Sequence, residues 1–313
     1  MSPHEGQFGA PVTGSDALIG VQVDIRDVGP RDGLQVEAPV EVGERVELIR
    51  ALAAAGLREI EVAAFVSPKA VPAMAGAVEV LENLADLAGV ARAALVPNAR
   101  GAEDAVAAGA DERTATVSVS EGYSRRNVRM TVAESLAALE RIVAIGAARS
   151  TPTDAVISCC FGSPYEGEIA PSDVGAIVDA CRAAGASRIT LADTTGMATP
   201  RGIDDVLDVV GTDVGLHLHE TRGTALVCAY AGLVRGVRRF DCSVGGLGGS
   251  PFAEGAAGNL ATEGLVSLLD DLGVVTGIDL HALVGVAARL RDLVGHELPS
   301  PVARSGPRLP VTG

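Results

Sequence analysis

Two histidines separated by a single residue, His217 and His219, stand in the segment HLHE at the end of an apolar run. Side chains two positions apart on a β-strand project from the same face. With Asp32 from GPRDGLQ and the carboxamide of Asn259, the imidazoles would form a nitrogen and oxygen ligand set without thiolate. Such a set suits a six-coordinate divalent ion, Mg²⁺ or Mn²⁺, with Co²⁺ or Zn²⁺ as alternatives. We therefore predict a divalent-metal site, the alternative being two strand histidines that are merely hydrogen-bonded.

Other polar side chains lie near the ends of further apolar runs. They are Arg31 and Gln35 after the first run, Glu61 in the second, Asn98 near the end of the third and Asp193 at the end of the sixth. A buried carboxylate needs a hydrogen-bonding or charged partner. Glu61 and Asp193 are therefore predicted to be active-site groups, the alternative being structural carboxylates bonded to Arg31 or to backbone amides.

The stretch SVGGLGGSPFAEGAAGNLATE, residues 243–263, is crowded with glycine. Glycine is used where the backbone bends tightly or approaches another group closely. We predict a functional loop here, the alternative being a plain connecting turn. Its candidate residues are Gly246, Gly248, Gly249, Ser250, Asn259 and Glu263.

Short apolar segments alternate with longer segments of helical spacing along the chain. The apolar segments are VQVDIRD, EIEVAAF, RAALVP, TATVSVS, AVISCC, RITLAD, VGLHLHE and RRFDCSV. This alternation predicts an α/β protein in which parallel strands with helical crossovers close into a (β/α)₈ TIM barrel over residues 21–297, with an additional C-terminal helix at 281–298. An open doubly wound sheet is the alternative, although no G-x-G-x-x-G follows the first segment. In a barrel the strand ends share one rim, so the candidate residues are expected to converge there.

Composition narrows the range of partners. The chain has 313 residues and a net charge of -15 without a long basic run, which argues against nucleic acid or an anionic membrane and favours a small-molecule partner. Five cysteines without C-x-x-C spacing, and no export signal or apolar run long enough to span a bilayer, predict a cytoplasmic protein. Residues 1–20 and 298–313 are rich in Pro, Gly and Ser and are expected to be flexible ends.

Six motifs resemble, in order and spacing, the 3-hydroxy-3-methylglutaryl-CoA (HMG-CoA) lyases of the HMGL-like family of metal-dependent TIM barrels. They are VGPRDGLQ, IEVAAFVSPKAVPAM, GSPYEGEIAPSDV, LADTTGMATP, HLHETRG and GGLGGSPFAEGAAGNLATE. The resemblance runs from about Val21 to Leu293. It implies a carbon–carbon lyase that cleaves an acyl-CoA to acetyl-CoA and a keto acid by a retro-Claisen reaction, a role in leucine degradation and a homodimer.

The resemblance also implies roles for individual residues. Its metal ligands match Asp32, His217, His219 and Asn259, and its active-site acids match Glu61, Asp193 and Glu263. Arg31 matches the group that stabilises the enolate oxygen, and His217 or Asp193 could accept the hydroxyl proton. The stretch from Gly245 to Gly249 resembles a mobile loop that closes over the acyl-CoA, and Gln35 is grouped with it at the substrate.

The chain departs from the family pattern at several positions. Ser250 replaces the cysteine of a G-G-C-P segment, and a thiol with a pKa of about 8.5 is a far better proton donor than an alcohol. Ala38 stands at a lysine position used for CoA phosphate in some members, Glu220 replaces an aspartate and Arg222 a tyrosine. Two alternatives to the lyase follow, a Claisen-type synthase or aldolase of the same family, and a catalytically impaired homologue.

Overall fold

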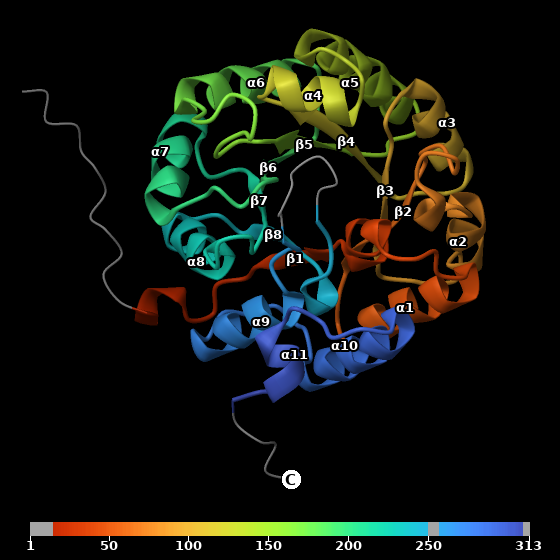
Figure 1. Ribbon diagram of the computed structural model, residues 1–313, viewed down its shortest axis with the longest axis vertical. Coiled ribbons are helices and arrows are strands. Elements are labelled where there is room, and N and C mark those ends of the chain that lie inside the picture. Colours follow the sequence, from red (N-terminus) through yellow and green to blue (C-terminus); the bar gives the residue numbers. More distant parts are fainter. Residues whose placement is uncertain (1–14, 250–256, 309–313) are drawn as a thin grey trace, which may run out of the picture.

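The computed structural model of the protein describes residues 15–249 and 257–308. Within these ranges, eight parallel strands close into a barrel in the order of the sequence (Figure 1). The strands are β1 (Asp24–Asp27), β2 (Glu59–Ala64), β3 (Ala91–Leu95), β4 (Glu112–Ser118), β5 (Thr153–Ser158), β6 (Arg188–Asp193), β7 (Gly215–Leu218) and β8 (Arg239–Cys242). The predicted TIM barrel is confirmed.

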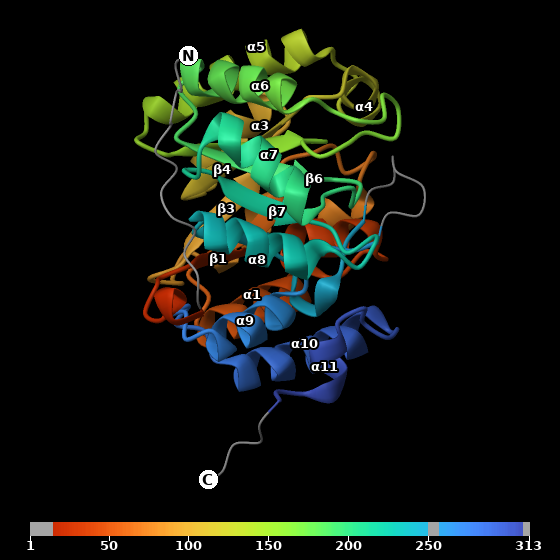
Figure 2. The same ribbon diagram turned by 90° about the vertical axis from the view of Figure 1, so that its left-hand side faces the viewer.

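Helices surround this barrel (Figure 1). They are α1 (Val42–Ala54), α2 (Ala77–Asn83), α3 (Ala99–Ala107), α4 (Glu121–Asn127), α5 (Val132–Ala147), α6 (Pro171–Ala183), α7 (Pro200–Val210), α8 (Ala225–Arg235), α9 (Thr262–Asp271), α10 (Leu280–Val294) and α11 (Pro301–Ser305). Short turns of 3₁₀ or π type are η1 (Ser15–Leu18), η2 (Gly29–Gly33), η3 (Leu34–Val36), η4 (Pro72–Met74) and η5 (Val244–Gly246). The expected additional helix is α10, which packs against α1, α9 and α11 (Figure 2). None of the helices in the described ranges is long and apolar enough to cross a membrane.

Local sequence explains where several helices begin. Helix α5 starts with a capping box, in which the Thr131 side chain accepts a hydrogen bond from the Glu134 backbone at 3.0 Å and Glu134 accepts one from the Thr131 backbone at 2.8 Å. Helix α7 starts at a proline, and the Thr199 hydroxyl before it accepts a hydrogen bond from the Gly202 amide at 3.0 Å. These caps fix the residues at which α5 and α7 begin.

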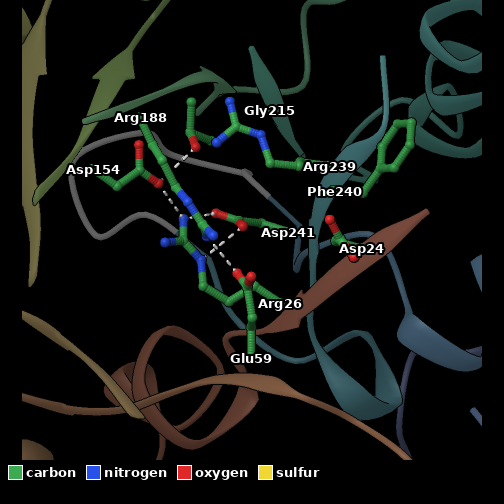
Figure 3. Close-up of a pocket in the computed structure, with 10 residues that line it drawn as sticks. Asp24, Arg26, Glu59, Asp154, Arg188, Gly215, Arg239, Phe240 and Asp241 are labelled. Carbon is green, nitrogen blue, oxygen red and sulfur yellow. Dashed lines mark hydrogen bonds and ion pairs between the residues drawn. The ribbon is translucent and has the colours of Figure 1, made fainter. Parts of the chain in front are cut away.

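The apolar core lies mainly between the strands and the surrounding helices, whereas the inside of the barrel carries charge. Arg26 of β1 reaches across the barrel to Asp154 of β5, with Nη2 and Oδ2 2.9 Å apart, and both side chains are buried. The residues that line the small cavity here are Asp24, Arg26, Glu59, Asp154, Arg188, Thr190, Gly215, Arg239, Phe240 and Asp241 (Figure 3). A charged layer therefore lies below the rim where the strands end.

The C-terminal segment differs from the flexible tail expected over 298–313. Leu298 and Ser300 are buried, the Ser300 amide donates to the Gly245 carbonyl at 3.2 Å, and α11 follows. A methyl group on Gly245 would lie 2.6 Å from Leu298, so the segment packs directly onto turn η5. Composition alone does not reveal this docking, because it depends on one apolar and one hydroxyl side chain. Residues 1–14 and 309–313 lie outside the described residues.

The packing of α5 onto β4 gives a test of the fold. Alanine at Gly146 would place its methyl group 1.5 Å from Nη2 of the buried Arg113. We expect Gly146→Ala to lower the free energy of unfolding by about 1–3 kcal/mol, as overpacking does, although Gly to Ala in an open helix raises it by about 0.5–1 kcal/mol. Gly285→Ala in α10 is the matched control, since nothing lies within 4 Å of its added methyl group. Urea denaturation of both variants measures the difference, and stabilisation by Gly146→Ala would contradict the packing described.

Candidate metal centre and active site

Three predicted ligands meet at the rim of the barrel. One ligand atom each from Asp32, His217 and His219 lies within 4.8 Å of the other two. His217 is in β7, and His219 follows the strand and is held by an isolated bridge to Asn259. Asp32 lies in turn η2, where the amides of Arg31, Asp32 and the next residue all donate to the Val28 carbonyl. The two histidines thus lie close together, as expected for side chains two positions apart.

Each imidazole is oriented by an acceptor on its other nitrogen. Nδ1 of His217 lies 3.2 Å from Oδ2 of Asp241, and Nδ1 of His219 lies 3.1 Å from the Ala257 carbonyl. Because both partners accept, we assign the protons to Nδ1, which leaves the Nε2 lone pairs facing each other at 3.1 Å. Facing lone pairs repel unless a proton or a cation lies between them. The pair therefore fits a divalent cation.

Asn259 completes the same cluster. Its Nδ2 donates to Oδ2 of Asp32 at 2.7 Å and to the Leu247 carbonyl at 3.0 Å. Its Oδ1 is buried and has no hydrogen-bond partner among the described residues. An orphaned buried oxygen is costly unless a ligand satisfies it. Oδ1 of Asn259 is therefore a further oxygen atom that could bind a cation beside the imidazoles.

The electrostatic surroundings favour the deprotonated forms of Asp32 and His219, which are the forms that bind a cation. Burial raises the pKa of Asp32, but the charges of Arg31 and the two imidazoles outweigh burial and hold it below its usual value. Burial, followed by the charge of His217, lowers the pKa of His219 to about 4. For His217, burial lowers the pKa, but the hydrogen bond to Asp241 and the negative charges of Asp241 and Asp32 together outweigh burial, so the pKa is raised. His219 is therefore the more readily deprotonated of the two imidazoles.

Arg31 lies beside the cluster and is held on two sides. Its Nη1 donates to Oδ1 of Asp32 at 2.7 Å, and its Nε donates to Oε2 of Glu61 at 2.5 Å. The Thr114 hydroxyl donates to the other oxygen of Glu61. Glu61 is therefore a buried partner of Arg31. The two carboxylates fix the plane of the guanidinium through its Nε and Nη1 atoms.

Asp193 ends β6 at the same rim. It accepts hydrogen bonds from the backbone amides of Met197 at 2.7 Å and Ala198 at 3.0 Å. Burial outweighs these bonds and raises the pKa of Asp193 to about 6. Arg222 donates from Nη1 to the Thr195 and Gly196 carbonyls at 2.9 and 2.8 Å, so it holds the loop that follows Asp193. Asp193 is thus a carboxylate whose pKa suits proton transfer near neutrality.

Glu263 lies apart from the three-ligand cluster. Both of its carboxylate oxygens accept from the Gly245 amide at 3.1 Å, and a further hydrogen bond comes from the Ser300 side chain. Burial raises the pKa of Glu263. Asp27 of β1 holds the adjacent Val244 amide at 3.0 Å in the same way. In this structure Glu263 holds turn η5, which is the first part of the glycine-rich stretch.

The remaining candidates have distinct places. Gln35 is half-buried in η3, and Asn98 caps α3 by accepting from the Gly101 amide at 3.0 Å. Gly246, Gly248 and Gly249 have positive φ of 73°, 125° and 156°. A methyl group on Gly248 would lie 2.3 Å from Nδ2 of Asn259, so the loop backbone passes directly over this ligand. Ser250 lies outside the described residues.

Sequence reasoning missed three residues that support the site. Thr114 holds Glu61, Asp241 holds His217, and Arg26 holds Asp241 with Nε and Nη2 at 2.9 and 2.8 Å from its two oxygens. All three side chains are buried. Asp241 and Arg26 carried one available signal, a charged residue in a short apolar strand. That signal does not identify the partner.

The chain is similar to known proteins over most of its length. The family model described as HMGL-like matches residues 22–290. A 3-hydroxy-3-isohexenylglutaryl-CoA/hydroxy-methylglutaryl-CoA lyase from Pseudomonas aeruginosa is 38% identical over 91% of this chain and 97% of its own length. An (R)-citramalyl-CoA lyase from Chloroflexus aurantiacus is 43% identical over 92% and 96%. The solved structure of an HMG-CoA lyase from Acinetobacter baumannii with coenzyme A and 3-methylmalate matches with a TM-score of 0.88 and 38% identity, over 96% of this chain and 98% of that chain.

The close approach of Gly248 to Asn259 predicts the effect of a methyl group there. Gly248→Ala must displace Nδ2 of Asn259, 2.3 Å away, and Oδ2 of Asp32 is 3.3 Å away. We expect divalent-cation affinity to fall about tenfold or more, the scale of a displaced supporting contact. Gly295→Ala is the control, since it also has positive φ but meets nothing within 4 Å. Isothermal titration with Mn²⁺ compares the two, and equal affinities would contradict the geometry of the cluster.

Proposed function

The chain belongs to the HMGL-like family and is a carbon–carbon lyase, and we propose that it cleaves HMG-CoA, or a close 3-hydroxy-3-alkyl acyl-CoA, to acetyl-CoA and a keto acid. The observation that carries the proposal is the Asp32, His217 and His219 cluster with the Arg31 guanidinium beside it. Such a site combines cation ligands with a fixed positive charge, which a retro-Claisen cleavage needs. The relatives named above are lyases, which supports this direction over a synthase.

Mg²⁺ or Mn²⁺ is the proposed cofactor. Asp32, His217, His219 and Oδ1 of Asn259 would hold it, as the facing Nε2 atoms and the unpartnered Oδ1 suggest. When bound, a divalent cation lowers the pKa of a substrate hydroxyl and orients it. The nitrogen and oxygen donors without thiolate favour these hard ions.

Arg31 is proposed to stabilise the developing enolate. As the carbon–carbon bond breaks, negative charge moves to the thioester oxygen of the departing acetyl-CoA. A guanidinium already fixed by Glu61 and Asp32 needs no reorganisation to meet that charge. Glu61 would act here by orienting Arg31.

Asp193 is proposed to accept the proton of the substrate hydroxyl. Its pKa of about 6, raised by burial, keeps it ionised at neutral pH while leaving it basic enough to take a proton. The two backbone amides that bind it hold its carboxylate at the end of β6. His217 serves as a cation ligand in this proposal, so its Nε2 is not available as a base.

A citramalyl-CoA substrate is the second candidate. The Chloroflexus relative named (R)-citramalyl-CoA lyase has the higher identity of the two relatives described. Both compounds are 3-hydroxy-3-methyl acyl-CoA thioesters and would present the same hydroxyl to the cluster. A cytoplasmic location, a place in leucine degradation and a homodimer stay predictions from composition and family resemblance, and sedimentation of the purified protein tests the last.

Cleavage assays test the proposed function. Purified protein should release acetyl-CoA and acetoacetate from (S)-HMG-CoA with Mg²⁺ or Mn²⁺ but not with EDTA, and citramalyl-CoA is assayed in parallel by mass spectrometry. Asp32→Asn should lower the rate by about two orders of magnitude, since it removes a charged ligand. Asp24→Asn, an exposed position on β1, is the control. A metal-bound protein that cleaves neither thioester would refute the proposed substrates.

The pH dependence tests the role of Asp193. Above its pKa of about 6 the carboxylate is ionised and can accept a proton, and below it the reactive form is lost. We expect kcat/KM at saturating Mn²⁺ to fall about tenfold per pH unit below pH 6. Asp193→Asn should be slow at every pH and lack this limb. A wild-type rate that stays flat down to pH 5 would assign the base elsewhere.

A further inference from the structure

Below the cation ligands, the inside of the barrel holds a connected set of charges. Figure 3 shows Arg26 directed at Asp241 and Asp154. Nε and Nη2 of Arg26 donate to Oδ1 and Oδ2 of Asp241 at 2.9 and 2.8 Å, which is the two-pronged geometry of an arginine and a carboxylate. Oδ2 of Asp241 also faces Nδ1 of His217 at 3.2 Å. Arg26, Asp241 and His217 thus form one chain from the charged layer to the rim.

We propose that Arg26 is a positioning residue of the cation site, which it serves by locking the Asp241 carboxylate that orients His217. The inference rests on the proposed function, because it assigns a purpose to the same site. A guanidinium with two parallel bonds fixes the plane of its carboxylate, whereas a single bond leaves rotation about the Cβ–Cγ axis. With the plane fixed, Oδ2 stays in line with Nδ1 of His217, and Nε2 stays aimed at the gap between the imidazoles.

The surroundings keep Arg26 in place and charged. Asp154 lies 2.9 Å from Nη2 on the opposite wall, and Glu112 lies 3.9 Å from Nη1. Both acids are buried, and an oxygen of each has no hydrogen-bond partner among the described residues. Three buried carboxyl groups, those of Asp241, Asp154 and Glu112, thus surround one guanidinium, which opposes its withdrawal from the barrel. Asp154 and Glu112 hold Arg26 from one side while Asp241 binds its other edge.

A purely structural ion pair would stabilise the barrel without affecting cation binding. Replacing Arg26 by lysine distinguishes this structural role from the positioning role. Arg26→Lys keeps the charge near Asp154 but cannot donate two parallel bonds to Asp241. Arg188 offers a matched control in the same layer, because its hydrogen bonds to described residues go to Glu59 and Glu112 at 2.7 and 3.4 Å. Arg188→Lys changes the layer without touching Asp241.

The experiment measures Mn²⁺ affinity of the folded variants by isothermal titration. We expect Arg26→Lys to bind Mn²⁺ about tenfold more weakly than wild type, and Arg188→Lys to bind as wild type does. Asp241→Asn should show a similar loss, and the double variant Arg26→Lys/Asp241→Asn should be no weaker than Asp241→Asn alone, since both changes break one chain. Unchanged affinity of folded Arg26→Lys, or additive losses, would overturn the positioning role.

A measurement on the unmodified protein covers the case in which Arg26→Lys does not fold. Nitrogen-15 spectra of the metal-free wild type at pH 8, assigned by comparison with His217→Gln, report which imidazole nitrogen carries the proton. The proposal requires the Nδ1–H form of His217, and the Nε2–H form would overturn it. Wild-type binding of Mn²⁺ with no effect of Arg26→Lys refutes this inference alone, whereas no wild-type binding refutes the proposed metal site itself.

Discussion

Charge buried inside a protein must meet an opposite charge or a hydrogen bond at every step, and this constraint shapes the barrel from its interior to its rim. Arg26 is balanced by Asp241 and Asp154, and Asp241 in turn carries His217. At the rim, Arg31 stands between Glu61 and Asp32 by the same logic. The site is therefore the upper end of a continuous electrostatic structure. Of the predicted ligands, His217 is held from the layer below, through Asp241. A cation between the two imidazoles would relieve the repulsion of their facing Nε2 lone pairs.

Two backbone features, turn η2 and the glycine-rich stretch, help to form the site. The π-type turn that follows β1 brings successive amides onto the Val28 carbonyl and so delivers Arg31 and Asp32 to the rim side by side. The glycine-rich segment comes so close to Asn259 that Gly248 has no room for a methyl group. Buried carboxylates from β1 and α9 hold the turn before that segment by its amides. Because these hydrogen bonds hold turn η5, the backbone that follows it can lie close to Asn259 at Gly248.

Much of the rim was predictable because two rules are local. Alternation in a strand places His217 and His219 on one face, and parallel strands end on one edge, so Asp32 and Asn259 could be expected beside them. Pairing across the barrel is not local, since β1 and β5 face each other and no sequence pattern states that Arg26 meets Asp154. The position of Glu263 shows a second limit. It follows Asn259 closely in sequence, but α9 begins at the residue before it, and its carboxylate turns to Gly245.

Ser300 links the mouth of the barrel to the end of the chain. Its amide donates to the Gly245 carbonyl and its side chain contributes a hydrogen bond to Glu263. Turn η5, which Asp27 and Glu263 also hold, is thus supported by a residue that follows all the strands and α10. Removal of the chain from Ser300 onward would therefore leave every strand complete and still take a hydrogen bond from turn η5.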